Sequence, residues 1–128
     1  MIIGNYKDVK LETVDHLLPG AKGAKIRWLI GDDVGKNSLL RRYDFEPNAM
    51  IPLHQHSHEH EMYILNGQGA VIVKDGEKEI GPGDFVYIES NEIHGFKNKS
   101  DTEPFIFLCI IPKERGSTSL YESIEESK

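Results

Sequence analysis

Four of the six histidines of this chain lie within seven residues, in the segment His54-Gln55-His56-Ser57-His58-Glu59-His60. Composition alone would place about one third of a histidine in a window of that length. Alternate side chains of a β-strand share a face, so His54 and His56 would lie about 7 Å apart on one side of the backbone. Neutral imidazole nitrogens at that spacing can converge on one zinc, iron, nickel or copper ion. The cluster therefore indicates a transition-metal site.

The ligand set depends on a turn within the cluster. A continuous strand would carry His60 about 20 Å from His54, too far for one ion. We therefore expect the polar segment Ser57–Glu59 to turn the chain, with His60 beginning the next strand and His58 at the tip, away from the metal. His94 is the remaining candidate for a fourth nitrogen, although spacing alone does not establish that it joins. Composition also leaves open a solvated histidine-rich loop.

The elements that would position these histidines are short apolar runs separated by turn residues. Turn signals recur about every 8–12 residues, the pattern of an all-β sandwich or barrel. Asp75-Gly76 lies between AVIVK and EKEI and predicts a tight type I′ hairpin turn. Glu46-Pro47-Asn48 predicts a turn that ends the strand before the histidines. The predicted strands are 25–30, 38–45, 61–66, 70–74, 84–88 and 104–111.

Length and charge restrict the class of protein. A chain of 128 residues favours a single domain, which we divide into an N-terminal arm (1–18), a barrel (19–112) and a polar tail (113–128). The net charge of −6 argues against nucleic-acid partners. No apolar run is long enough to span a membrane. A single cysteine excludes an intrachain disulfide and favours a cytoplasmic location, and the isolated His16 is interpreted as a surface residue.

At the histidine cluster the sequence resembles the cupin superfamily of small metal-binding β-barrels. The first motif of that family is G-x5-H-x-H-x(3,4)-E-x6-G. His54, His56 and Gly67 match it. Asn48 stands in place of the first glycine, and His60 stands in place of the glutamate ligand. The resemblance is closest to small prokaryotic cupins with a four-histidine site.

The second cupin motif, G-x5-P-x-G-x2-H-x3-N, extends the resemblance to the distant histidine. Gly83, His94 and Asn98 match it, whereas Glu89 and Asn91 replace its proline and inner glycine. The resemblance implies a double-stranded β-helix, the jelly-roll barrel of cupins. It also implies one divalent metal bound by four side chains: His54, His56, His60 and His94. A set with Glu61 in place of His60 is the alternative.

The reaction is less specified than the metal, because cupins host many functions on one fold. A neutral four-histidine shell disfavours magnesium and calcium and suits manganese, iron, nickel, copper or zinc. Four protein ligands leave two adjacent positions for a small-molecule substrate and oxygen. We therefore expect a metal-dependent oxidoreductase of the dioxygenase type. The alternatives are a non-redox isomerase or lyase acting on a sugar or small acid, and a non-catalytic cupin that binds a small molecule.

Other side chains are assigned by their strand faces. Met62, Phe96 and Asn98 share the faces of the histidines and are expected to line the metal pocket. The resemblance to four-histidine cupins implies the same for Cys109, and all four also fit a plain core. Glu59 and Glu61 are expected to hydrogen-bond ligand imidazoles. For the adjacent Arg41 and Arg42 we favour surface or interface positions, since a buried unpaired arginine is costly. An exposed N-terminal arm favours a homodimer formed by edge-strand addition.

Overall fold

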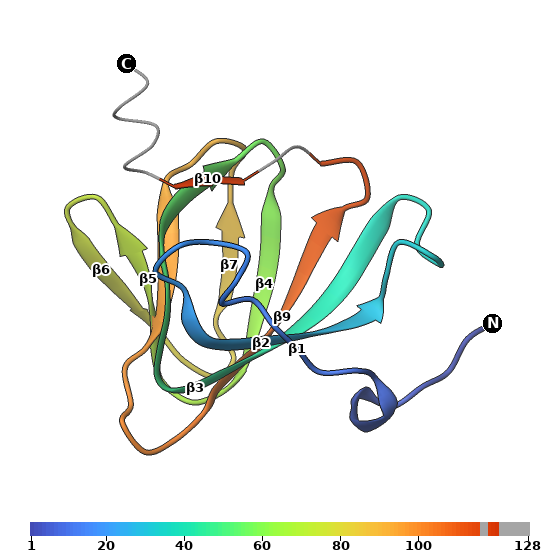
Figure 1. Ribbon diagram of the computed structural model, residues 1–128, viewed down its shortest axis with the longest axis horizontal. Coiled ribbons are helices and arrows are strands. Elements are labelled where there is room, and N and C mark those ends of the chain that lie inside the picture. Colours follow the sequence, from blue (N-terminus) through green and yellow to red (C-terminus); the bar gives the residue numbers. More distant parts are fainter. Residues whose placement is uncertain (116–117, 121–128) are drawn as a thin grey trace.

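The computed structural model describes residues 1–115 and 118–120, and these form a curled antiparallel sheet that makes a half-barrel (Figure 1). The all-β class predicted from the sequence is confirmed. No helix of the described residues is long and apolar enough to cross a bilayer. The elements are η1 (Tyr6–Asp8), β1 (Glu12–Thr13), β2 (Lys22–Ile30), β3 (Ser38–His56), β4 (His60–Asn66), β5 (Gly69–Val73), β6 (Gly76–Ile80), β7 (Phe85–Ile88), β8 (His94–Asn98), β9 (Phe105–Pro112) and β10 (Thr118–Leu120).

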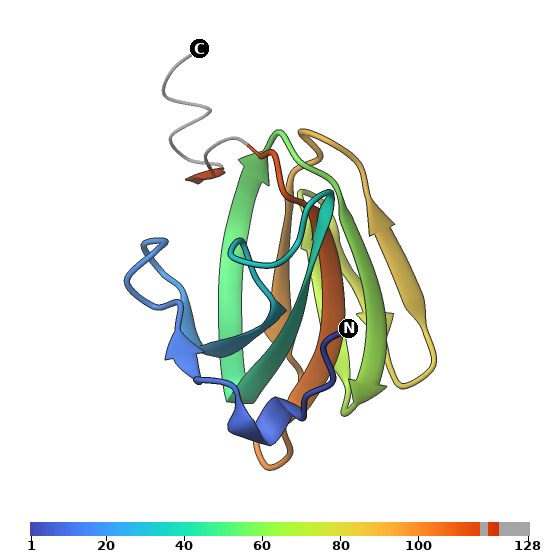
Figure 2. The same ribbon diagram turned by 90° about the vertical axis from the view of Figure 1, so that its right-hand side faces the viewer.

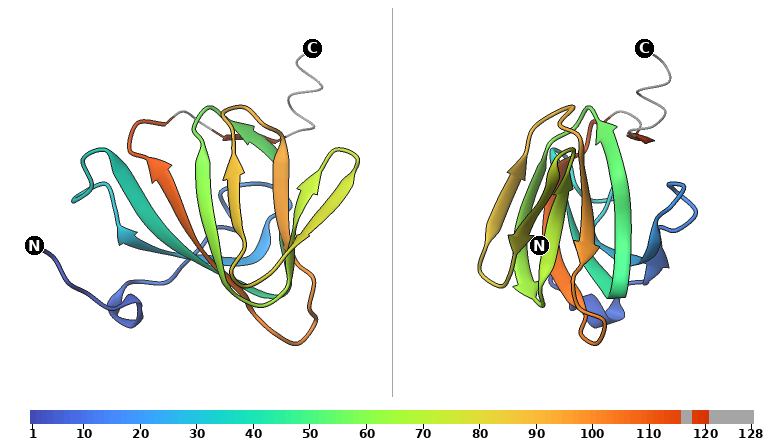
Figure 3. Two further views of the ribbon diagram at one scale, coloured as in Figure 1. Left: turned by 180° about the vertical axis from the view of Figure 1, so that it is seen from behind. Right: turned by 90° about the vertical axis from the view of Figure 1, so that its left-hand side faces the viewer.

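The long strand β3 joins the two halves of the sheet. The strand order is β6-β5-β8-β3-β9-β4-β7, with β2 and β10 also pairing with β3. The first half of β3 pairs with β2 and β9, and its second half pairs with β8 and β10. The sheet therefore curls around a buried interior (Figures 2 and 3), into which alternate side chains of β3, β4 and β9 point.

Two asparagines that replace motif glycines explain how this chain keeps the cupin turns. Asn48 has φ 63° and Asn91 has φ 65°, and both therefore adopt the left-handed conformation. Asparagine reaches this region more readily than other non-glycine residues. At Gly67 the glycine is retained, with φ 86°, because a Cβ there would lie 2.2 Å from the carbonyl oxygen of Pro104. The replacements at positions 48 and 91 thus preserve the backbone conformation that the motif requires.

The six predicted strands are confirmed, with two differences at turns. Glu46-Pro47-Asn48 does not end a strand, because β3 continues through it with a register shift further along. The hairpin of β5 and β6 forms, but Val73 pairs with Gly76, so its two-residue loop is Lys74-Asp75. The type I′ expectation was wrong, since neither loop residue has a positive φ and Gly76 carries it instead.

The arm and the segment Thr118–Leu120 both pair with the barrel strands. In the arm, β1 pairs with β2, and Val14 belongs to the buried core. Near the other end, β10 pairs with the His54–His56 end of β3, so part of the predicted polar tail is a strand. Residues 116–117 and 121–128 of that tail lie outside the described residues.

Candidate metal centre

Histidines from three strands meet inside the half-barrel. His54 lies directly opposite His94 in the pairing of β3 with β8, and their ring centroids are 4.3 Å apart. The ligand nitrogens of His54, His56 and His94 all lie within 4.8 Å of one another. His60, at the start of β4, places its Nε2 2.7 Å from Nε2 of His56. The structure therefore brings together the four histidines proposed from the sequence, and all four are buried.

Backbone carbonyls orient three of these imidazoles. In each ring Nδ1 donates to a carbonyl two residues away, which leaves the Nε2 lone pair free to bind a metal. The three bonds are 2.6–2.7 Å long and run from His54 to Pro52, from His56 to His58, and from His94 to Glu92. The buried Nε2 of His94 has no hydrogen-bond partner among the residues that the structure describes. An orphaned nitrogen of this kind fits a metal ligand.

Burial keeps the histidines neutral at pH 7. It lowers the pKa of His54 to about 4 and the pKa of His94 to about 3. Burial likewise lowers the pKa of His56 and of His60. Only neutral imidazole binds a metal, so the set is in its ligating form without the cost of removing protons. An all-nitrogen donor set fits the transition metals expected from the sequence.

These depressed pKa values predict acid sensitivity of the metal-free protein. Histidine in the unfolded chain takes up a proton near pH 6.5, whereas His54 in the folded chain does so only near pH 4. Between these values the unfolded state binds more protons, so the free energy of unfolding falls as the pH falls. From His54 alone we expect a loss of about 2 kcal/mol between pH 7.5 and pH 5. Urea unfolding at the two pH values measures it. The loss should shrink in His54→Asn, and equal stability of the wild type at both pH values would contradict this prediction.

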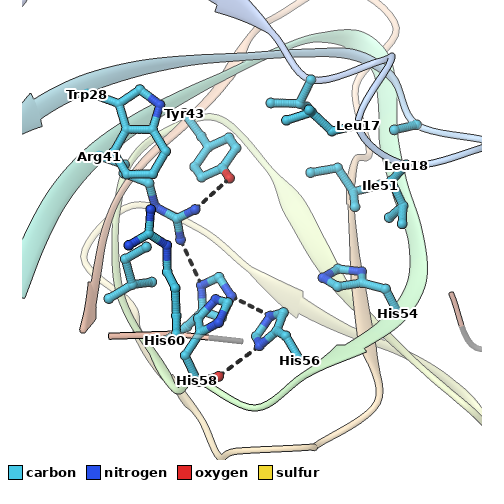
Figure 4. Close-up of a pocket in the computed structure, with 14 residues that line it drawn as sticks. Leu17, Leu18, Trp28, Arg41, Tyr43, Ile51, His54, His56, His58 and His60 are labelled. Carbon is cyan, nitrogen blue, oxygen red and sulfur yellow. Dashed lines mark hydrogen bonds between the residues drawn. The ribbon is translucent and has the colours of Figure 1, made fainter. Parts of the chain in front are cut away.

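Four histidines form one end of a cavity of about 330 Å³ (Figure 4): His54, His56, His58 and His60. Its walls are largely apolar. The N-terminal arm contributes Val14, Leu17 and Leu18, and the barrel contributes Ala21, Ile51 and Ile111. Trp28 also lines it, with the Arg41 and Arg115 guanidinium carbons 5.5 and 5.6 Å from its ring centroid. The cavity thus combines nitrogen ligands, two cations and an apolar wall.

Arg41 is buried beside the histidines, so the surface position favoured for it was wrong. It donates to the Tyr43 hydroxyl at 3.0 Å and approaches His60 and Cys109. Among the described residues no carboxylate forms an ion pair with it. Arg42 points the opposite way, as alternation requires, and pairs with Asp44. A buried guanidinium without a counter-ion gives the cavity an uncompensated positive charge.

Comparison with known proteins identifies the family. Residues 41–111, more than half of the chain, match the model described as "Cupin domain". This chain is a cupin. The solved structure of the polyketide cyclase RemF from Streptomyces resistomycificus is 32% identical, with a TM-score of 0.86, over 94% of this chain and 85% of that one.

Two further relatives agree with the family. A cupin-2 domain from Rhodospirillum rubrum is 23% identical with a TM-score of 0.79, over 99% of this cupin and 87% of that chain, which supports the fold. An oxalate-binding protein from Thermotoga maritima is 26% identical over 107 residues, 81% of this cupin and 88% of the relative.

The four side chains expected to line the pocket of this cupin do not line this cavity, although Cys109 and Phe96 contact histidines of the cluster. Cys109 and Met62 are neighbours across β9 and β4 in the core, and Phe96 packs against His94 with ring centroids 5.3 Å apart. The Asn98 amide donates to three backbone carbonyls and so has a structural role: those of Phe45, Glu46 and Glu103. None of the four is among the residues that line the cavity.

The glutamates and His58 also differ from expectation. Glu59 accepts from the Tyr87 hydroxyl, and the exposed Glu61 makes no hydrogen bond to an imidazole in the described structure. Backbone carbonyls, rather than these two glutamates, accept the hydrogen bonds from three of the ligand imidazoles. His58 follows β3 as predicted, but its ring turns inward and stacks on His56 with centroids 3.9 Å apart. His56, His58 and His60 therefore form a second group that could hold a metal.

Sequence reasoning missed several residues of the cavity. Tyr43 is two residues from Arg41 on β3, so the same alternation that turns Arg41 inward would have identified it. Trp28 lies on β2 opposite Arg41. The apolar contribution of the arm has no comparable signal, because it depends on how residues 14–18 fold over the mouth of the barrel.

Proposed function

We propose that this cupin is a metal-dependent enzyme acting on a small, largely apolar molecule with a carbonyl or carboxylate oxygen. A divalent metal bound by His54, His56, His60 and His94 would supply Lewis-acid polarisation of that oxygen. The proposal rests on the positive charge of the cavity. The ligands are neutral, and the buried Arg41 has no carboxylate partner among the described residues.

The protein's own residues favour a substrate that develops negative charge on oxygen. Arg41 holds a fixed positive charge in a site shielded from water, where it stabilises an oxyanion more strongly than it would in solution. Tyr43 accepts from Arg41, which leaves its hydroxyl hydrogen for an oxygen of the ligand. The apolar walls formed by Leu17, Leu18 and Ile51 would hold the remainder of the molecule by shape.

The comparisons support the same class of substrate. A polyketide cyclase acts on a molecule rich in carbonyl groups, and oxalate is a small dicarboxylate that can chelate a metal. Isomerisation, elimination or ring closure next to a carbonyl group can proceed through an enolate, which a cation beside the oxygen stabilises. This non-redox chemistry is therefore our first candidate.

A dioxygenase-type oxidoreductase is the second candidate. The neutral imidazole set suits manganese, iron and copper, whose redox states support oxygen chemistry. A dioxygenase reaction requires that substrate and oxygen both reach the metal beside the apolar wall. Simple ligand binding without a reaction is the remaining alternative.

One experiment separates these functions. Metal content is measured on the protein as purified, and the metal-loaded protein is then mixed with 1-phenylbutane-1,3-dione in D₂O. The CH₂ group between the two carbonyls exchanges its protons for deuterium, and NMR follows the rate of this exchange. We expect the wild type to exchange them faster than His94→Ala does. Oxygen consumption with the same compound would favour the second candidate. Tight metal binding with neither effect across a panel of diketones and keto acids would overturn the enzymatic proposal.

We also propose that the chain works as a homodimer in the cytoplasm, where its single thiol stays reduced. The outer face of β4 and β7 carries Tyr63, Phe85 and Tyr87, which are 50%, 84% and 55% exposed. These rings offer roughly 300–450 Å² of surface, about half of what one partner of a stable dimer buries. A groove of about 360 Å³ runs beside them, lined in part by Leu108 and Ile110.

We expect Phe85→Glu to convert the dimer into a monomer, because it would bury a carboxylate between two copies. Light scattering after gel filtration measures the mass, and Asp75→Ala on the β5–β6 loop is the control. A monomeric wild type would contradict the dimer, and a dimeric Phe85→Glu would contradict this face as its interface.

A further inference from the structure

His60 differs from the other three histidines in what faces its Nδ1. The others donate to backbone carbonyls. Nδ1 of His60 instead faces two side chains, the Cys109 sulfur at 2.9 Å and a guanidinium nitrogen of Arg41 at 3.2 Å. All three side chains are buried, and the same Arg41 nitrogen lies 2.9 Å from the Cys109 sulfur. The orientation of one imidazole thus depends on side chains rather than on the backbone.

The neighbouring hydrogen bonds determine where His60 carries its proton when no metal is bound. Nδ1 of His56 faces a carbonyl and must be protonated, so Nε2 of a neutral His56 is a lone pair. Nε2 of His60 lies 2.7 Å from that lone pair and must be the donor. Nδ1 of His60 is then an acceptor, which suits Arg41, a group that only donates.

A metal ligand requires the opposite tautomer. For Nε2 of His60 to bind a metal, the imidazole proton must lie on Nδ1. There Arg41 cannot accept it, and the Cys109 sulfur is the acceptor within reach. The two neighbours of Nδ1 therefore favour different tautomers of the same ring.

Building on the proposed metal site, we infer that Cys109 is a positioning residue that accepts the Nδ1 proton of His60 and so lets His60 become the fourth ligand. Arg41 opposes this tautomer and limits the affinity for metal. Cys109 does for His60 what the backbone carbonyls do for the other ligands. The proposed ligand role of His60 thus depends on a thiol sulfur, a weak acceptor.

Zinc affinity, measured by competition with a chromophoric chelator, tests the roles of the two neighbours. Cys109→Ala removes the acceptor and should weaken zinc binding 10–100-fold, the range found for partners of metal ligands. Cys109→Ser keeps an acceptor for the Nδ1 proton of His60, so its zinc affinity should stay within about threefold of wild type. Arg41→Met removes the opposing donor and should tighten zinc binding, and an unchanged affinity would contradict the role given to Arg41. Urea unfolding of each metal-free variant separates these effects from lost packing.

Histidine ¹⁵N NMR tests the tautomer directly. In metal-free protein His60 should carry its proton on Nε2, while His54, His56 and His94 carry theirs on Nδ1. With zinc bound, all four should be protonated on Nδ1. A metal-free His60 already protonated on Nδ1 would overturn the inference, as would equal zinc affinity of Cys109→Ala and wild type.

Two results separate this inference from the proposed function. A wild type that binds no zinc would contradict the metal site itself, whereas the metal-free NMR measurement still decides the tautomer. If zinc binds tightly and Cys109→Ser loses as much affinity as Cys109→Ala, the metal site stands and the acceptor role of Cys109 is wrong.

Discussion

His94→Ala should lower the affinity for zinc more than about 100-fold, beyond the range for residues that only support a ligand. His94 lies opposite His54 across β3 and β8, and its buried Nε2 has no hydrogen-bond partner among the described residues. The neighbouring His58 groups with His56 and His60 but not with His54, so it does not supply the nitrogen that faces His54. Isothermal titration with zinc, checked by chelator competition, measures the change.

His58→Ala is the matched comparison, because His58 is buried in the same cluster and contacts the same ring of His56. Its side chain is not needed to orient His56, which donates to the backbone carbonyl of residue 58. Zinc affinity should therefore stay within about threefold of wild type, since neither a ligand nor its support is lost. The reverse ranking of the two variants would mean that His56, His58 and His60 hold the ion.

Arg41→Met should weaken oxalate binding to the zinc-loaded protein 10–100-fold. A hydrogen bond to a charged group contributes about 1.5–3 kcal/mol, and Arg41 is a buried cation that lines the cavity. Methionine keeps most of the volume, and replacement of a buried charge by an apolar residue is often neutral for stability. Oxalate is the probe ligand because it is a small dianion. Its affinity is measured by calorimetry at saturating zinc.

Arg42→Met is the control for this prediction. Arg42 lies next in sequence but points to the outer face, where it pairs with Asp44. It should leave oxalate affinity unchanged. Equal effects of the two substitutions would show a general loss of positive charge, and an unchanged Arg41→Met would contradict the role of Arg41 in binding an oxyanion.

The sequence was sufficient for the parts of the site that follow strand alternation. His54 and His56 share a face by parity, and the two cupin motifs extended the set to His60 and His94. Asn48 and Asn91, which depart from the motif glycines, proved compatible with it because both adopt a positive φ. The motif is thus preserved as a backbone conformation rather than as a residue type.

The rest of the site depends on contacts between distant segments. Alternation shows that Arg41 and Arg42 point opposite ways, but only the fold shows which one is inside, and Tyr43, Trp28 and Cys109 surround it. The free-energy cost of burying an arginine favoured a surface position in the sequence analysis. In the structure, contacts with these partners offset that cost. The inward turn of His58 likewise depends on the geometry of the loop between β3 and β4, which residue types do not encode.

X-ray absorption spectroscopy of the zinc-loaded protein determines whether the histidine cluster holds the metal. It reports the number and type of atoms bound to the metal. The account predicts one zinc per chain, bound by four imidazole nitrogens and by no sulfur. Zinc bound by two or fewer imidazoles, or by the sulfur of Cys109, would contradict it.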